Sequence, residues 1–160
     1  MDVKRIALIG GAGSGKTTAL ENFCQSMMQK GKREQGTAFI NGQKICCWSS
    51  SYPKTFTQLP VNMDGALVFL DSTKGVTEDD TKLMNYLEKR NIPHVILANK
   101  QDLTNRKLEV HSHAPTVPTV AMKTACMVGA VETLLKIISP YQYHQNKCAL
   151  EVVTIKSSVN

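Results

Sequence analysis

Eight residues near the N-terminus, Gly10–Thr17 (GGAGSGKT), restrict the possible folds more than any other part of the sequence. They follow a hydrophobic run that ends at Ile9 and precede a stretch of helix-forming residues. The pattern GxxxxGK[ST] between a strand and a helix is that of a phosphate-binding loop. Its glycines let backbone amides converge on phosphate oxygens, and the following helix N-terminus adds positive partial charge. The segment therefore predicts an α/β fold with a phosphate site after its first strand.

The residue types in this loop have separate chemical roles. We expect Lys16 to reach the β and γ phosphates and the Thr17 hydroxyl to ligate Mg²⁺. An ordinary glycine turn before a helix is the alternative, but the flanking strand and helix match the context that the motif requires. The residues predicted to bind phosphate are Gly11, Ala12, Gly13, Ser14, Gly15, Lys16, Thr17 and Thr18.

Strand-like and helix-like segments alternate along much of the chain. This alternation predicts a mainly parallel sheet with helices on both faces and right-handed crossovers. Residues 49–63 show no clean period and are predicted to form a loop. We expect strands at 3–9, 37–41, 44–48, 66–70, 95–98 and 117–122, and helices at about 16–30, after Thr77, and at about 128–138.

Two short segments carry stronger local signals. Asn41-Gly42 is a dipeptide favoured in tight hairpin turns, so the strands on either side are predicted to be antiparallel neighbours. Thr77 precedes Glu78-Asp79-Asp80, which suits a helix N-cap followed by an acidic first turn. The core face of that helix is then predicted to consist of Leu83, Met84 and Leu87.

The length of 160 residues and the hydrophobic content of 42% fit one globular domain. We assign 1–140 to this domain and 141–160 to a tail, which forms either an extra edge strand at 150–155 or a segment that binds a partner. The sequence contains neither an apolar run of membrane-spanning length nor a lipid-anchor motif. We therefore expect a cytoplasmic protein without a stable membrane anchor.

The net charge of +6 includes a local cluster at Lys30, Lys32 and Arg33. An anionic partner is conceivable, but a solvated helix end is the preferred interpretation, and no nucleic-acid partner is expected. The five cysteines are odd in number and lack CxxC spacing, which favours reduced thiols over disulfides or zinc. The oligomeric state is left open.

A second motif, Asn99-Lys100-Gln101-Asp102, follows the predicted strand at 95–98 directly. A carboxylate at Asp102 can accept two hydrogen bonds from N1 and N2 of guanine, whereas adenine has no equivalent donor pair. Asn99 can support the loop and contact the base, and the aliphatic stem of Lys100 can cover the ring. Alone, such a loop is as often a plain turn, but combined with the phosphate loop it predicts a guanine-nucleotide site.

Together, these motifs resemble the Ras-like small GTPase superfamily over roughly residues 3–138. The segment 65–103 (GALVFLDSTKGVTEDDTKLMNYLEKRNIPHVILANKQDL) is similar to the prokaryotic branch that includes the gliding-motility switch GTPases, and to Arf-type proteins. The resemblance implies a three-layer P-loop NTPase fold with a mostly parallel six-stranded sheet. It also implies binding of GTP or GDP with Mg²⁺, and a protein effector or regulator.

The resemblance further implies a third base-binding loop and a metal-sensing threonine. The loop is best matched by Thr124, Ala125 and Cys126, where the amide of Ala125 would meet guanine O6, although a small residue packed under the last helix explains the match almost equally well. The threonine is best matched by Thr37, although a β-branched residue that enters an ordinary strand explains that position equally well.

The sequence departs from this family in the segment after the third strand, where the pattern DxxG is expected. If Phe56 matches the phenylalanine that often closes this segment in the family, Ser49 replaces the aspartate, Tyr52 the glycine, and Pro53 the glutamine that orients water. Ala12 also adds a methyl group near the γ phosphate. Asp71 could replace the missing acid, but a turn cap is the preferred interpretation. Slow or absent intrinsic hydrolysis is therefore expected.

These observations favour a guanine-nucleotide-binding switch with weak or absent intrinsic hydrolysis. A GTP hydrolase activated by a partner, a small P-loop kinase or other ATP-binding protein, and a structural protein with a permanently bound nucleotide are the alternatives. The guanine-reading motif and the lack of an evident arginine-rich lid count against the kinase.

Overall fold

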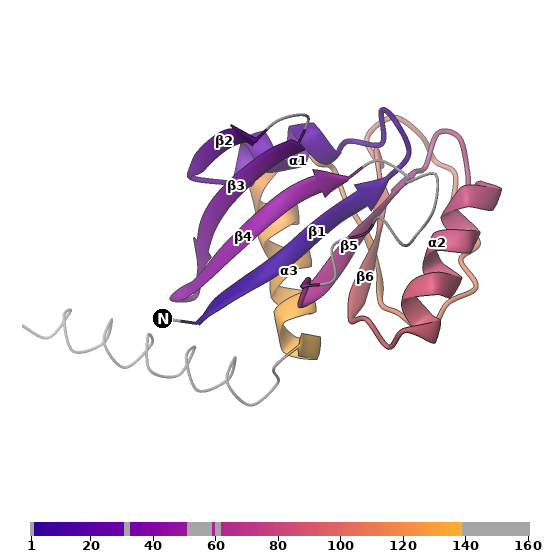
Figure 1. The fold of residues 1–160 in the computed structure, drawn as a ribbon. Helices are drawn as coiled ribbons and strands as arrows, with labels where there is room; N and C mark the ends of the chain where they lie inside the picture. The colour runs from indigo at the N-terminus through magenta and orange to yellow at the C-terminus, as the bar shows by residue number, and fades with distance from the viewer. Residues whose placement is uncertain (1, 31–32, 51–58, 60–61, 139–160) are drawn as a thin grey trace, which may run out of the picture.

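The structure is a computed structural model that describes residues 2–30, 33–50, 59 and 62–138. One strand precedes the first helix, and further strands and helices follow it, so the described part of the chain has the predicted mixed α/β character (Figure 1). The predicted tail 141–160 lies outside the described residues. In chain order, the described part contains β1 (Val3–Gly10), α1 (Lys16–Phe23), β2 (Ser26–Lys30), β3 (Arg33–Ile40), β4 (Gln43–Ser50), β5 (Gly65–Asp71), α2 (Glu78–Lys89), β6 (His94–Asn99), β7 (Thr116–Pro118) and α3 (Thr124–Ile138).

All strands of the described part belong to one seven-stranded sheet with the order β2-β3-β4-β1-β5-β6-β7. β1 runs parallel to both β4 and β5, and the parallel pairing continues through β6 to β7. β2, β3 and β4 form an antiparallel edge. We predicted a mostly parallel sheet of six strands, whereas the sheet of the described part has seven. The carboxyl ends of β1 and β4 meet at the upper edge of the sheet in Figure 1.

The additional strand, β2, corrects the prediction of a helix over 16–30. α1 ends at Phe23, and Cys24 has the extended backbone conformation φ −80°, ψ 138°. The amide of Gln25 then donates to the carbonyl of Thr37 over 2.8 Å, and β2 pairs with β3 from there. The prediction of a helix over 24–30 was wrong because this segment forms hydrogen bonds to β3 in place of continuing the helix. The local sequence does not show that β3 lies beside it.

Other predicted boundaries also change. The strand predicted at 37–41 begins earlier, at Arg33, as β3. The strand predicted at 117–122 is limited to β7, and the helix predicted from 128 begins four residues earlier as α3. Ser49 and Ser50, predicted as loop, complete β4. The rest of the predicted loop at 49–63 falls mainly on 51–58 and 60–61, which lie outside the described residues.

The two local signals are confirmed. Asn41 and Gly42 both have positive φ, 51° and 76°, as a tight hairpin turn requires, and they connect β3 to β4. Thr77 caps α2: its side chain accepts from the amide of Asp80, and the Asp80 carboxylate accepts from the amide of Thr77. The predicted core face of α2 is buried, namely Leu83, Met84 and Leu87.

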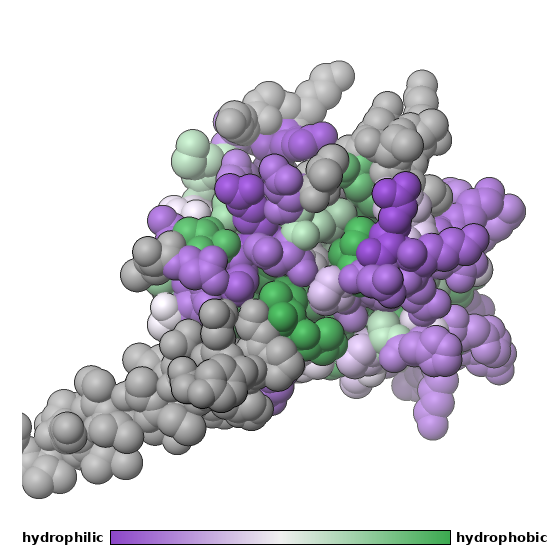
Figure 2. Space-filling model, turned by 60° about the horizontal axis from the view of Figure 1, so that its bottom comes forward, coloured by the Kyte–Doolittle hydropathy of each residue, from purple (hydrophilic) through white to green (hydrophobic). Residues whose placement is uncertain are grey.

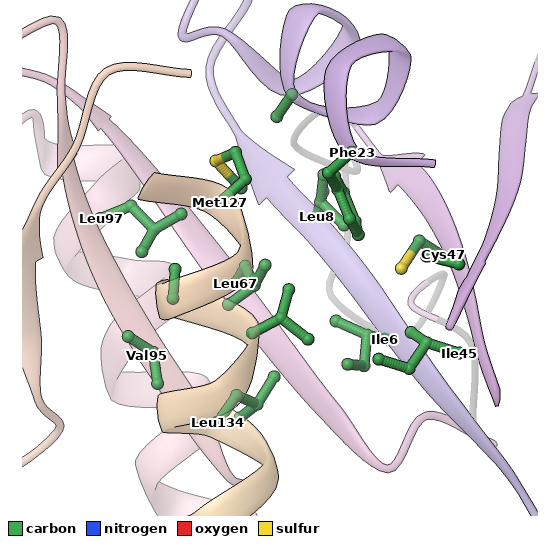
Figure 3. Close-up of a cluster of buried hydrophobic side chains, with 14 of the residues drawn as sticks. Ile6, Leu8, Phe23, Ile45, Cys47, Leu67, Val95, Leu97, Met127 and Leu134 are labelled. Carbon is green, nitrogen blue, oxygen red and sulfur yellow. The ribbon is translucent and has the colours of Figure 1, made fainter. Parts of the chain in front are cut away.

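Side chains that alternate along β1 divide the core into two parts. Ile6 and Leu8 belong to a cluster covered by α1 and α3, which Figure 3 shows in close-up. Ala7 and Ile9 belong to a second cluster, on the opposite face of the sheet, which α2 covers. This is the predicted three-layer arrangement. β1 is thus packed on both faces, and the loop at its carboxyl end begins from this buried strand.

The surface differs in character from this core. Figure 2 shows mostly hydrophilic residues on its right-hand side, where α2 lies, and a smaller hydrophobic area near the centre of the view. Among the helices of the described part, none is both long enough and apolar enough to cross a membrane.

Candidate functional site

The loop between β1 and α1 has the strand-loop-helix setting predicted for a phosphate cradle. Gly13 and Gly15 have φ values of 73° and 107°, a region that glycine enters without steric cost. A Cβ atom on Gly15 would lie 2.2 Å from Nδ2 of Asn99, and one on Gly10 would lie 2.6 Å from the carbonyl oxygen of Phe69. The glycines therefore allow both the tight turn and its close contact with neighbouring strands.

Lys16 folds back across this loop. Its Nζ atom donates to the carbonyl oxygens of Gly10 and Gly11, both at 2.7 Å, and lies 3.5 Å from Oγ of Ser14. Lys16 is only 8% exposed, and this burial lowers the pKa of its ammonium group. Carbonyl oxygens therefore hold the ammonium group within the loop, next to the backbone that is predicted to surround phosphate.

A cavity of about 550 Å³ lies against the loop. It brings together every predicted phosphate-binding residue except Gly11, which lines a neighbouring cavity. It also includes residues from β2, β3, β4 and the segment after β6. The lining consists of Ala12, Gly13, Ser14, Gly15, Lys16, Thr17, Thr18, Gln29, Glu34, Ser49 and Lys100.

Asn99 connects the glycine-rich loop to the turn after β6 and to the segment 119–121. It ends β6 and is only 1% exposed. Its Nδ2 donates to the carbonyl of Ser14 over 2.8 Å, while its Oδ1 accepts from the amide of Ala121 at 2.9 Å and from the hydroxyl of Thr119 at 3.2 Å. The predicted supporting role of Asn99 thus has a geometric basis, whereas its contact with a base stays a prediction.

Lys100 is positioned by Asp71, which ends β5. The Lys100 backbone has φ 64°, and its Nζ lies 2.8 Å from Oδ2 of Asp71. Burial raises the pKa of Asp71, but hydrogen bonds from Lys100 and Thr73 outweigh it and hold that pKa below its ordinary value. The Asp71 Oδ1 atom accepts from the amide of Thr73 over 3.0 Å, which is the turn-capping role that we preferred for this residue.

The remaining residues of the second motif occupy a turn after β6. Gln101 donates from Nε2 to Oγ of Ser72 over 2.7 Å, and the amide of Leu103 donates to the carbonyl of Lys100 over 3.0 Å. Asp102 is exposed between them. The loop is thus held by its neighbours while the Asp102 side chain is accessible, as a base-reading carboxylate requires.

The segment 124–126, predicted to be the third base-binding loop, is helical. Thr124, Ala125 and Cys126 form the first turn of α3, and the Thr124 hydroxyl donates to the carbonyl of Asn22 over 3.0 Å. Instead, the segment 119–121, directly after β7, contacts Asn99. Our sequence reasoning missed this segment, because 119–121 lies within the strand that we predicted at 117–122, whereas the strand ends at Pro118. Guanine binding by Thr124, Ala125 and Cys126 stays a prediction.

Near Thr17, the structure points to a residue that our sequence reasoning missed. The Thr17 hydroxyl donates to Oε2 of Glu34, at the start of β3, over 2.8 Å. Thr37, the predicted metal-sensing threonine, pairs with Ser26 and Cys46 within the sheet and is not among the described residues that line the cavity. Its metal contact stays a prediction. The spacing from Thr17 to Glu34 has no motif, so only the fold reveals their proximity.

The altered segment after β4 is described in part. Ser49, which our sequence alignment places at the aspartate of the DxxG pattern, lines the cavity. It pairs with Leu8 in the parallel register of β1 and β4, two residues before the end of β1. Tyr52 and Pro53 lie outside the described residues.

Several solved structures are similar to this fold. The cytosolic domain of the T. maritima FeoB iron transporter in apo form matches with a TM-score of 0.68 and 13% identity, covering 86% of this chain and 64% of that one. The T. maritima FeoB G domain matches with a TM-score of 0.64 and 15% identity, covering 84% and 98%. A variant of S. thermophilus NFeoB bound to GDP matches with a TM-score of 0.64 and 23% identity, covering 83% and 62%. The fold is therefore that of a G domain.

Sequence comparison gives a more specific relationship. No protein-family model matches the chain. The uncharacterized protein MJ1339 of Methanocaldococcus jannaschii is 31% identical over 115 residues, which cover 64% of this chain and 73% of that protein. With this identity over most of the length of MJ1339, the chain belongs to the MJ1339 family.

Proposed function

We propose that this chain binds GDP or GTP with Mg²⁺ and acts as an atypical molecular switch with weak or absent intrinsic hydrolysis. The observation that carries this proposal is the set of hydrogen bonds made by Asn99. They join the phosphate loop at Ser14 to the second motif and to the segment at Ala121. A nucleotide has a phosphate end and a base end, so a site for it must hold two recognition loops at a constant separation.

The phosphate end of the site would use the loop amides and Lys16. Lys16 lies inside the loop and carries the positive charge that phosphate oxygens require. The hydroxyl of Thr17 and the carboxylate of Glu34 offer hard oxygen donors, which is the ligand type that Mg²⁺ prefers. When bound, Mg²⁺ neutralises part of the phosphate charge. The residues present therefore fit the expected metal.

The base end of the site would select guanine through Asp102. This carboxylate is exposed beside a loop held by Asn99 and Lys100, and it can accept the paired donors of guanine. The likeness in fold to an NFeoB variant bound to GDP supports the same assignment. Lys100 would cover the base with its stem while its ammonium group stays paired with Asp71.

We expect slow hydrolysis because of the residue types at three positions of the sequence. Ser49 lines the cavity but brings no charge, and the sequence has Tyr52 and Pro53 in place of the glycine and glutamine of the family. Proline has neither a side-chain amide nor a backbone donor with which to orient an attacking water. We infer that nucleotide binding is retained where catalysis is weak, and that a cytoplasmic protein partner reads the nucleotide state or supplies the missing groups.

Calorimetry on the full chain with GDP, GTP and ATP tests the guanine assignment. We expect GDP and GTP to bind and ATP to bind at least ~10-fold more weakly, because a mismatched buried donor or acceptor costs ~1–3 kcal/mol. Asp102→Asn removes the paired acceptor and should weaken GDP binding by at least ~10-fold on the same grounds.

Glu109→Gln is the matched control, since Glu109 is also an exposed acid in the segment after β6. It should bind GDP like the unmodified chain. Equal affinity of the unmodified chain for ATP and GTP would refute guanine selection and favour the ATP-binding alternative.

A further inference from the structure

The start of β3 places a carboxylate inside the cavity that is proposed to hold phosphates. Glu34 lines this cavity together with Lys16 and Thr17, and it accepts the hydrogen bond from the Thr17 hydroxyl at 2.8 Å. The contact links residues on α1 and β3, two elements that pack against each other (Figure 1). A negative side chain at this position is unexpected for a phosphate site and requires an explanation.

The sheet register shows that Glu34 is part of a row across the edge strands. Glu34 pairs with Gln29 of β2, and Gln35 pairs with Trp48 of β4, so one further step along both strands brings Glu34 beside Ser49. Gln29, Glu34 and Ser49 all line the cavity. Ser49 stands where the family pattern has its acid, so the neighbouring strand supplies a carboxylate close to the position where one is missing.

Electrostatics limits what this carboxylate can do when a nucleotide is bound. Among the described residues that line the cavity, Glu34 is the acidic one, and Lys16 and Lys100 are the basic ones. A carboxylate next to phosphate oxygens repels them unless a cation lies between the two groups. A divalent cation reverses the sign of the interaction, because the carboxylate then becomes a ligand shared with the phosphates.

The spacing of the two oxygens agrees with coordination of one small cation. Mg²⁺ binds oxygen at about 2.0–2.1 Å in a nearly octahedral shell, which places adjacent ligand oxygens about 2.9 Å apart. The oxygens of Thr17 and Glu34 are 2.8 Å apart. The hydrogen bond thus holds both oxygens at nearly the separation that two adjacent ligands of one Mg²⁺ would have.

We propose that Glu34 is a direct ligand of the Mg²⁺ at the nucleotide site, adjacent to Thr17, and takes the place of the acid absent at Ser49. This inference rests on the proposed function, because the metal is bound together with nucleotide phosphates. Coordination replaces the hydrogen bond between Thr17 and Glu34. In this family member, the acidic support of the metal therefore comes from β3 rather than from the segment after β4.

The test compares GDP affinity with excess Mg²⁺ and with EDTA, by calorimetry on the chain of 160 residues. In the unmodified chain, Mg²⁺ should strengthen GDP binding. Glu34→Gln keeps the size and hydrogen-bonding ability of the side chain but removes its charge, and it should reduce the gain from Mg²⁺ by about 10- to 100-fold. Its affinity in EDTA should equal or exceed that of the unmodified chain, because the repulsion from phosphate is removed.

Two further variants complete the design. Glu34→Asp retains a carboxylate and should keep part of the Mg²⁺ gain, and Glu21→Gln, at an exposed acid on α1, should keep all of it. Circular dichroism checks that each variant is folded.

The possible failures are distinguishable. If Glu34→Gln keeps the full Mg²⁺ gain, Glu34 is not a metal ligand and the inference is wrong. If it tightens GDP binding equally with Mg²⁺ and with EDTA, Glu34 only obstructs the site, which also overturns the inference. If the unmodified chain binds no guanine nucleotide under either condition, the proposed function fails and the inference fails with it.

Discussion

Replacement of Asn99 by alanine probes the junction on which the candidate site depends. The side chain is buried and joins three segments that are distant in sequence, through Ser14, Thr119 and Ala121. Truncation leaves the carbonyl of Ser14 and the amide of Ala121 without these partners, while the Thr119 hydroxyl can rotate toward another acceptor. The perturbation thus removes two buried backbone contacts and a small side-chain volume.

The expected loss of stability follows from those two backbone groups. Each buried group left without a partner costs about 1–3 kcal/mol, and water that enters the vacated space recovers part of this cost. We therefore expect Asn99→Ala to lower the free energy of unfolding by about 2–4 kcal/mol. With an m-value of about 2 kcal/mol per molar urea, the unfolding midpoint should fall by about 1–2 M.

Asn99→Asp separates the two contacts. Aspartate keeps an acceptor for the amide of Ala121 but loses the donor to Ser14 and turns a negative charge toward that carbonyl. Asn99→Asp should therefore weaken GDP binding at least as strongly as Asn99→Ala, because it removes the hydrogen bond that holds the phosphate loop at Ser14. Urea unfolding followed by circular dichroism gives the stability, and calorimetry gives the affinity.

Asn85→Ala, at an exposed asparagine on α2, is the control and should change stability by less than about 0.5 kcal/mol. An Asn99→Ala variant as stable as this control, with unchanged GDP affinity, would show that the three loops hold their positions without Asn99. Asn99 would then not be the residue that organises the site.

Two further outcomes follow from the phosphate end of the site. Lys16→Ala should abolish tight nucleotide binding and leave the circular-dichroism spectrum unchanged, because the hydrogen bonds described for the Lys16 side chain all go to its own loop. Full retention of nucleotide affinity would refute the phosphate-loop assignment. Single-turnover release of phosphate from GTP should be slower than about 10⁻³ per second, the scale of the intrinsic rate of Ras-type switches. A rate of about one per second from the isolated chain would show that other residues replace the groups missing at Ser49, Tyr52 and Pro53.

Several parts of this protein could be predicted because their signals are local. The glycine-rich loop, the Asn41-Gly42 turn and the N-cap at Thr77 each lie within a few residues, and each depends on backbone preferences that the neighbouring residues satisfy. The buried strands β1, β5 and β6 could also be predicted. Burial on both faces requires nearly continuous apolar runs, which the sequence displays.

Other features are decided by tertiary contacts between distant residues. The segment 26–30 looks like a continuation of α1, but it forms β2 because β3 offers a full antiparallel ladder. The partner of Asn99 at Ala121 is 22 residues away, and the partner of Thr17 at Glu34 is 17 residues away. Neither pair has a spacing that a motif could encode.

The physical reason is the range of the interactions. Turn and capping preferences act through bonds between near neighbours, so a short stretch of sequence contains both partners. The pairing of β2 with β3, the anchoring of Asn99 and the approach of Glu34 to Thr17 depend on how the sheet brings separate strands together. The sequence alone therefore identified the loops that recognise phosphate and guanine in our proposal, whereas only the folded sheet determined which side chains join those loops and which carboxylate lies beside the predicted metal ligand.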